Sequence, residues 1–162
     1  MAPERITLRS SAFDAGTAIP KRHAYGGEGD NLSPELGWSG VPEATQEFAL
    51  ICDDPDAPSP QPWVHWVIYK IPRDARGLAE GVPARARLDS PRGALQGKNS
   101  WKEIGWGGPF PPPGHGTHHY HFKLYALDAP LALDAGATKA ELVRAMQGHV
   151  IARGELGGTY RR

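Results

Sequence analysis

The sequence has 162 residues, a length that fits one domain, which we expect to span residues 1–162. Its 18 Lys and Arg balance its 18 Asp and Glu, so the formal net charge is zero. A neutral chain creates no overall field that attracts phosphate backbones or acidic membranes, so we expect no nucleic-acid partner.

The start of the sequence carries Glu4, Arg5 and Arg9, where a secretory signal would have its apolar segment. No run approaches the roughly 18 apolar residues that a membrane-spanning helix needs. We therefore expect a cytoplasmic protein without a transmembrane anchor. The single cysteine, Cys52, lies in an apolar run, which is typical of a small side chain that packs in a core.

Five segments have the patterns of β-strands. Segments 5–8 and 119–127 alternate apolar and polar residues, as half-exposed strands do. Segment 47–52 is a short apolar run, and 63–71 is rich in β-branched and aromatic residues. We expect these two to pair in the core, with 47–52 as a central strand, and a final strand over 151–160.

Long loops and one helix complete the pattern. Regions 20–36, 72–97 and 105–116 are predicted to be mostly loop, because their glycines and prolines do not suit regular structure or they lack a clear period. Thr138 and Glu141 have the spacing of a capping box, which marks a helix start. Apolar and aromatic side chains then follow at helical spacing: Leu142, Ala145, Met146 and His149. The sequence thus predicts a mainly β sandwich with one or two peripheral helices.

Polar side chains that could carry chemistry gather near the predicted strand ends. They are Asp53, Asp54 and Asp56; His65; and His115, His118, His119 and His121. An Asp-Pro-Asp stretch most often makes a turn, and a histidine in an apolar strand is most often a core residue. Both simple interpretations stay open for each group taken alone.

The histidine cluster does not have the pattern of a metal site. His119 and His121 share one face of a predicted strand, whereas His115 and His118 lie in or at the edge of a loop. Zinc needs three or four converging ligands, so we expect no metal. The sequence also has no nucleophile elbow, P-loop or dinucleotide fingerprint. We therefore predict no cofactor and no catalytic residues.

Several short motifs occur together over nearly the whole chain. The strongest are DPDAPS at 54–59, HW at 65–66, GGPFPP at 107–112, and HHY at 118–120 with FKLYAL at 122–127. In these motifs the chain resembles the phosphatidylethanolamine-binding proteins, also called Raf kinase inhibitor-like proteins, in their bacterial and archaeal branch. His119 stands where that family usually has an arginine.

The resemblance implies a Greek-key β fold in which a large antiparallel sheet packs on a smaller one. It also implies a small pocket near a sheet end that takes phosphate-like anions or phosphorylated headgroups. The pocket residues that it implies are Asp54, Asp56, His65, Gly108, Pro109, His118 and Tyr120. The expected function is non-enzymatic binding, with a protein kinase or serine protease as a partner and a homodimer as a further expectation from bacterial relatives.

The predicted pocket combines imidazoles with carboxylates. A carboxylate raises the pKa of a neighbouring imidazole above its usual ~6.5, and the charged ring can then donate to phosphate oxygens. We therefore expect anion affinity to increase as the pH falls from about 7 to about 5.5. Two alternatives stay open: a phosphoester hydrolase with Asp54 and His65 as a general-base pair, and a serine protease inhibitor acting through proline-rich segment 55–62 or 109–113.

Overall fold

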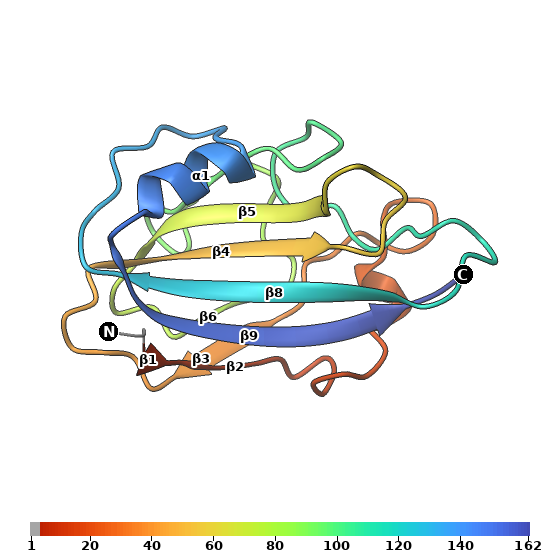
Figure 1. Ribbon diagram of the computed structural model, residues 1–162, viewed down its shortest axis with the longest axis horizontal. Helices are drawn as coiled ribbons and strands as arrows, with labels where there is room; N and C mark the ends of the chain where they lie inside the picture. Colours follow the sequence, from red (N-terminus) through yellow and green to blue (C-terminus); the bar gives the residue numbers. More distant parts are fainter. Residues whose placement is uncertain (1–3) are drawn as a thin grey trace.

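The computed structural model describes residues 4–162 and contains two β-sheets and one α-helix in that range (Figure 1). The first three residues of the expected domain lie outside the described residues. The six-stranded sheet has the order β1 (Glu4–Arg5), β9 (Val150–Tyr160), β8 (His118–Leu127), β4 (Glu47–Asp54), β5 (Trp63–Pro72) and β7 (Leu95–Gln96). The three-stranded sheet has the order β2 (Thr7–Arg9), β3 (Leu36–Ser39) and β6 (Gly77–Leu78). This confirms the predicted mainly β fold with a larger and a smaller sheet.

The centre of the large sheet follows the predicted pattern. β4 lies between β8 and β5, pairs antiparallel with both, and has all of its residues buried. β8 alternates buried Tyr120, Phe122 and Leu124 with more exposed neighbours, because one of its faces packs in the core. The predicted pairing of segments 47–52 and 63–71 is therefore confirmed.

The predicted strand at 5–8 is divided between the two sheets. β1 runs parallel to β9 at the edge of the large sheet, and β2 runs antiparallel to β3 in the small sheet. Ile6 lies at the change of sheet, and its N–H donates to the carbonyl of Arg153. The large sheet is antiparallel except at this edge.

The predicted loops contain short elements that the sequence pattern did not indicate. A 3-10 helix, η1 (Lys21–His23), lies in region 20–36, and β6 and β7 lie in region 72–97. Strand β3 begins at the end of the first loop and was not predicted. Strands β3 and β6 belong to the small sheet, whereas β7 forms one edge of the large sheet.

The large sheet is covered on both faces. Towards the small sheet, the core contains Trp38, Phe48, Trp66 and Phe122. On the other face a second apolar cluster joins the sheet to helix α1 (Lys139–Met146), which lies beside β4 and β5 (Figure 1). Cys52 is fully buried, as predicted, and this burial raises the pKa of its thiol well above the ordinary value.

Helix α1 begins with the predicted capping box. The Thr138 hydroxyl accepts from the Glu141 N–H at 3.2 Å, and the Glu141 carboxylate accepts from the Thr138 N–H at 2.9 Å. The helix ends at Met146, before Gly148 with its φ of 81°. The prediction that His149 belongs to the helix is wrong, because that glycine turns the chain into β9. None of the helices in residues 4–162 has the length and apolar character needed to span a membrane.

Candidate functional site

One end of the large sheet brings four of the predicted site residues together around a cavity. Asp54 ends β4, His65 lies near the start of β5, and His118 and Tyr120 begin β8. Because both β5 and β8 run antiparallel to β4, these positions lie at the same end of the sheet. They line a cavity of about 210 Å³. The other lining residues are Ala57, Pro58, Ser59, Trp63, Trp101, Phe110, Pro111 and Pro112.

A buried carboxylate holds the imidazole of His118. The Asp54 Oδ2 atom accepts from His118 Nδ1 at 2.6 Å, and both side chains are almost fully buried. The second oxygen of Asp54 accepts from the Asp56 N–H at 2.8 Å. With Nδ1 bound to the carboxylate, the Nε2 atom of His118 is the nitrogen that is free for other partners.

His118 continues this hydrogen-bond chain to the surface. Its Nε2 atom lies 2.6 Å from Nδ1 of His115, an exposed residue. His115 stands between Gly114 and Gly116, which have φ angles of 74° and 95°. Glycine adopts these left-handed conformations without the steric cost that other residues meet. The chain Asp54, His118, His115 therefore runs from a buried carboxylate to a loop that bends at two glycines.

His65 behaves differently from the prediction. Its Nδ1 atom donates to the Gly107 carbonyl at 2.6 Å, and its ring packs edge-on against Tyr120 and Trp101. Burial lowers the pKa of His65 to about 4, and the nearby Gly107 carbonyl and Asp54 only partly oppose this. The expectation of a raised imidazole pKa is wrong for His65, because loss of water outweighs the carboxylate. Near neutral pH its Nε2 atom is an acceptor.

Asp54 and His65, the pair of the hydrolase alternative, have no hydrogen bond to each other in residues 4–162. Asp54 is hydrogen-bonded to His118, whereas His65 is hydrogen-bonded to a backbone carbonyl. Both residues line the cavity, but the Asp54 carboxylate and the His65 ring are each held by a different group.

Tyr120 supplies a hydroxyl to the same cavity. The residue is 1% exposed, and its hydroxyl has no hydrogen-bond partner among the described residues. Burial raises the pKa of Tyr120 far above the ordinary value, and the Asp54 charge adds to this effect. The phenol therefore stays protonated and can donate to a ligand in the cavity.

Aromatic side chains that were not predicted as site residues form one wall of the cavity. Trp63 packs edge-on against Trp101, with ring centroids 5.3 Å apart, and Trp101 stacks on Tyr25 at 4.2 Å. Phe110 is 42% exposed and has the Arg162 guanidinium 4.0 Å above its ring. A large aromatic residue between two prolines in a loop was the available sequence signal for Phe110.

The remaining predicted residues, Asp56, Gly108 and Pro109, do not line the cavity. Asp56 accepts from both the N–H and the Nδ1 atom of His119, the latter at 2.7 Å. The Gly108 N–H donates to the Asn31 side chain at 2.8 Å, and the Pro109 carbonyl accepts from the Tyr25 N–H. These contacts fasten the two loops that form the rim.

We expect Gly108→Ala to disturb this rim. A Cβ atom at position 108 would lie 1.9 Å from the His23 carbonyl oxygen, so one of the two loops must move. Overpacking of this kind lowers the free energy of unfolding by about 1–3 kcal/mol. Urea unfolding measures the change. Gly157→Ala is the control, because a Cβ there meets nothing within 4 Å; equal losses in both variants would contradict the tight contact.

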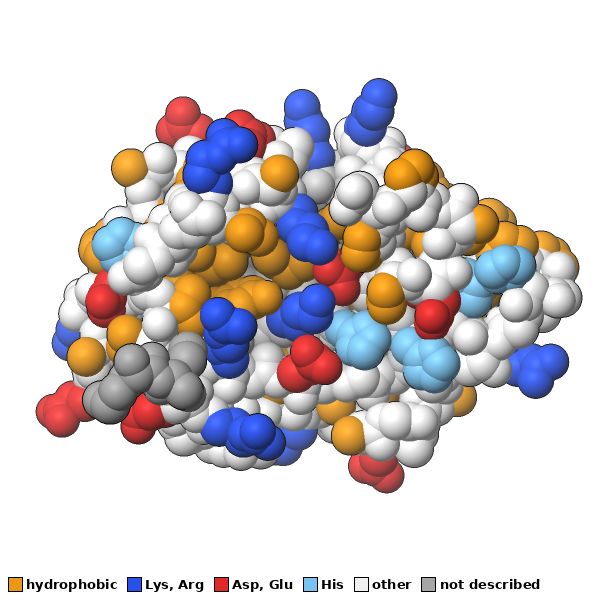
Figure 2. Space-filling view, in the orientation of Figure 1, with side chains coloured by type: hydrophobic (Ala, Val, Ile, Leu, Met, Phe, Trp, Pro, Cys, Tyr) orange, Lys and Arg blue, Asp and Glu red, His pale blue; other side chains and the backbone are white. Residues whose placement is uncertain are grey.

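The four clustered histidines do not converge. His115 contacts His118, whereas His119 pairs with Asp56 and His121 lies 3.3 Å from Glu155. In Figure 2 most of the visible histidine side chains lie toward the right end of the face, and another lies at the opposite end. Within residues 4–162, no three His, Cys, Asp or Glu side chains are grouped so that they could hold a metal ion.

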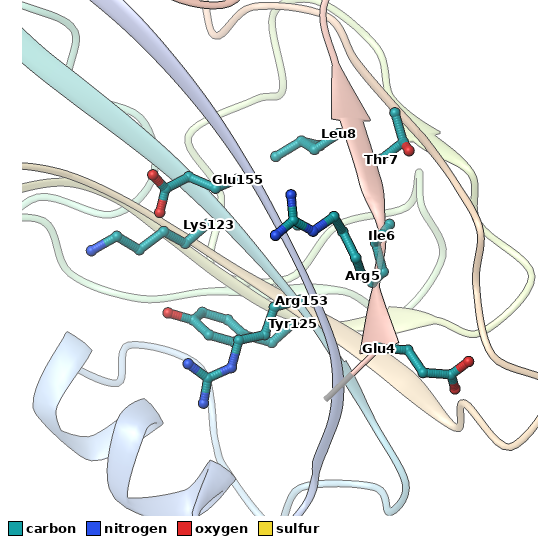
Figure 3. Close-up of a pocket in the computed structure, with 10 residues that line it drawn as sticks. Glu4, Arg5, Ile6, Thr7, Leu8, Lys123, Tyr125, Arg153 and Glu155 are labelled. Atoms are coloured by element: carbon teal, nitrogen blue, oxygen red, sulfur yellow. The ribbon is translucent and has the colours of Figure 1, made fainter. Parts of the chain in front are cut away.

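A larger groove, of about 930 Å³, lies elsewhere, beside β1, β8 and β9 (Figure 3). It contains none of the predicted site residues. Two of its charged side chains have partners within the protein: Lys123 pairs with the buried Asp53, and Glu155 lies 3.3 Å from His121. Arg153 lies over the Tyr125 ring, and Arg5 is directed to a different part of the groove (Figure 3). We therefore take the smaller cavity as the candidate site.

Comparison with known proteins agrees with this architecture. The family model for phosphatidylethanolamine-binding protein matches residues 9–161. A UPF0098 protein of Methanothermobacter thermautotrophicus is 48% identical, covering 97% of this chain and 99% of its own length. The crystal structure of YbcL from Escherichia coli, described as a new member of the mammalian PEBP family, has a TM-score of 0.91 at 34% identity, with 98% of this chain and 99% of that chain covered. A phosphatidylethanolamine-binding protein homologue from Chlamydia trachomatis has a TM-score of 0.85 at 39% identity over the same shares. The chain belongs to the phosphatidylethanolamine-binding protein family.

Proposed function

We propose that this protein binds a small phosphate-like anion or a phosphorylated headgroup in the cavity of Asp54, His65, His118 and Tyr120, without catalysing a reaction. The observation that carries the proposal is the buried Asp54–His118 pair at the wall of a cavity of about 210 Å³. Family membership supports a binding role, and the names of the compared relatives designate no enzyme.

The cavity offers donors and an acceptor that suit a phosphate group. The Tyr120 hydroxyl and a protonated His118 Nε2 can donate to phosphate oxygens. The neutral His65 Nε2 can accept from a P–OH group or from an ammonium group. The volume lies below the ~300–1,000 Å³ of drug-sized sites, which favours a headgroup over a larger molecule.

The aromatic wall favours a cationic group on the same ligand. Trp63, Trp101 and Phe110 line the cavity, and an ammonium over the face of such a ring gains about 0.5–2 kcal/mol. Phosphoethanolamine carries both a phosphate and an ammonium group. We therefore expect it to bind several-fold more tightly than inorganic phosphate.

Protons should control access to His118. The contact between His115 Nδ1 and His118 Nε2 needs one donor and one acceptor. When both rings are protonated, each of these two nitrogens carries a hydrogen and neither can accept, so the two charged rings repel each other and the glycine-flanked His115 can leave. His118 then donates to the ligand. Affinity should accordingly increase as the pH falls from about 7 to about 5.5.

Isothermal titration calorimetry with phosphate and phosphoethanolamine tests the proposal. We expect Tyr120→Phe to weaken binding about five- to tenfold, the effect of one lost hydrogen bond, and His118→Gln to weaken it more. His121→Gln, on the outer face of β8, is the control and should bind normally. Unchanged affinity in both cavity variants would refute the assignment.

A turnover assay with phosphomonoesters distinguishes the binding proposal from the hydrolase alternative. We expect no turnover, and turnover that Asp54→Asn abolishes would replace the binding proposal with catalysis.

The protease-inhibitor alternative stays a prediction. Its two proline-rich segments supply Pro58, Pro111 and Pro112 to the cavity rim. A kinase or protease partner, a homodimer and a cytoplasmic location likewise stay predictions.

A further inference from the structure

A second hollow, which we call the α1 groove, lies on the other side of the wall that bounds the cavity. It has a volume of about 860 Å³ and lies between helix α1 and the segments at 61–64 and 98–102. Trp63 and Trp101 face the cavity, whereas their chain neighbours Pro62, Val64 and Ser100 line the groove. The groove is therefore separate from the candidate site but shares a wall with it.

All the charged side chains that line the groove are positive. It contains Lys98, Lys102, Lys139 and Arg144, and no Asp or Glu. Lys139 is already neutralised by the buried Asp53 at 2.7 Å. Lys98, Lys102 and Arg144 form no ion pair with any residue in the described part of the chain, so three cations face solvent in one hollow of a protein with zero net charge.

Carboxylates near the groove are engaged elsewhere. Glu141 lies on the same helix, and its carboxylate accepts from the N–H and the hydroxyl of Thr138. Glu103, which follows Lys102, accepts from the Tyr25 hydroxyl at 2.9 Å. The Thr138 hydrogen bonds lower the pKa of Glu141 most. The charges of Arg144 and Lys98 also contribute to the lowered pKa, so this carboxylate offsets part of their charge. Neither Glu141 nor Glu103 lines the groove, so within it the cations meet no carboxylate except Asp53, which pairs with Lys139.

Between these cations the groove is apolar. Val64, Pro62 and Val143 lie in its lining, and Val143 is 41% exposed, although large apolar side chains are usually covered. A lone phosphate or carboxylate ion would leave this surface wet. The occupant must therefore present an apolar side chain together with several negative charges.

The loop at the groove edge is held in a defined shape. Asn99 Oδ1 accepts from the N–H groups of Trp101 and Glu103, and Lys102 between them has a φ of 65°. Left-handed backbone is uncommon for lysine and persists where the surroundings fix it. One cationic edge of the groove is thus preorganised, which lowers the entropy cost of binding.

We propose that the α1 groove binds an acidic peptide segment of a protein partner, with an apolar side chain of the segment on Val64 and Val143 and its carboxylates on Lys98, Lys102 and Arg144. A concave site of this volume suits a peptide, whereas a membrane surface needs a protruding apolar face. The proposal does not depend on anion binding in the cavity.

Selection from two synthetic hexapeptide libraries tests the proposal. One library places Leu, Val or Phe among Asp and Glu, and the other has Lys in place of the acids. We expect the full chain to bind the acidic library, and the triple variant Lys98→Glu, Lys102→Glu, Arg144→Glu to bind selected peptides at least about tenfold more weakly. Added salt should weaken binding of the wild type.

Two control variants show whether an effect on peptide binding is specific to the groove. Arg73→Glu, Arg87→Glu and Arg92→Glu reverse three exposed cations outside the groove and should leave peptide affinity unchanged. His118→Gln should also retain it, so a failure of the cavity proposal is seen separately. The proposal is overturned if neither library is enriched, if the groove triple variant binds like the wild type, or if only phosphatidylserine vesicles or a second copy of the chain bind through these cations.

Discussion

Asp54→Ala should lower the free energy of unfolding by about 1–3 kcal/mol, because it leaves the buried Nδ1–H of His118 without its hydrogen-bond partner. Both side chains of this pair are nearly inaccessible, at 2% and 3%, and their atoms lie 2.6 Å apart. The same change removes the group that orients His118 toward the cavity. Urea unfolding at neutral pH measures the stability, and calorimetry measures the accompanying loss of phosphoethanolamine binding.

Asp56→Ala is a control of the same chemistry in a different environment. Asp56 and His119 are 2.7 Å apart, but their side chains are 42% and 58% exposed. An exposed ion pair contributes at most about 1 kcal/mol, because water and salt screen it. A loss of similar size in the two variants would mean that burial of the Asp54–His118 pair does not determine its contribution.

The second large effect is a dependence of stability on pH that comes from His65. The unfolded chain binds a proton on this residue near its ordinary pKa of 6.5, whereas the folded protein binds it only near 4. Stability is therefore complete above the unfolded value and is lost as the pH falls toward 4. This difference should remove about 2.5 kcal/mol of the free energy of unfolding between about pH 7 and pH 4.5.

His65→Asn should flatten this pH profile. An asparagine amide can still donate to the Gly107 carbonyl, but it has no proton to gain in this range. The variant is expected to be less stable at neutral pH and to lose much less on acidification. A residual slope is expected from other groups, including His23, whose pKa burial also lowers. An unchanged slope in His65→Asn would show that His65 is already charged in the folded protein.

The long strands could be predicted because their side-chain patterns are local. β8 alternates over most of its length, and β4 contains the continuous apolar run 48–52, so the pairing of segments 47–52 and 63–71 followed from the sequence. The short strands β3, β6 and β7 depend on contacts with distant segments. The sequence pattern also does not show that the chain changes sheet at Ile6. That change depends on the parallel pairing of β1 with β9, two segments that are far apart in the sequence.

The sequence predicted the polar residues that line the candidate site, but it did not predict the aromatic residues that form its wall. Asp54, His65, His118 and Tyr120 meet as expected, since each lies near the same end of a strand. Trp63 and Trp101 resemble core residues in the sequence, and only the fold places them at a cavity. The pKa direction of His65 was wrong because a sequence shows neighbouring charges more readily than it shows complete burial.

Imidazole signals in 15N-edited nuclear magnetic resonance spectra, recorded during titration with phosphoethanolamine, test the central claim most directly. Binding in the cavity should shift the ring nitrogens of His118 and His65 and change the His115 signals as its contact with His118 breaks. The rings of His121 and His149, which lie outside the cavity, should not respond. Shifts confined to those distant rings, or no saturable shift at His118, would contradict an anion site built on the Asp54–His118 pair.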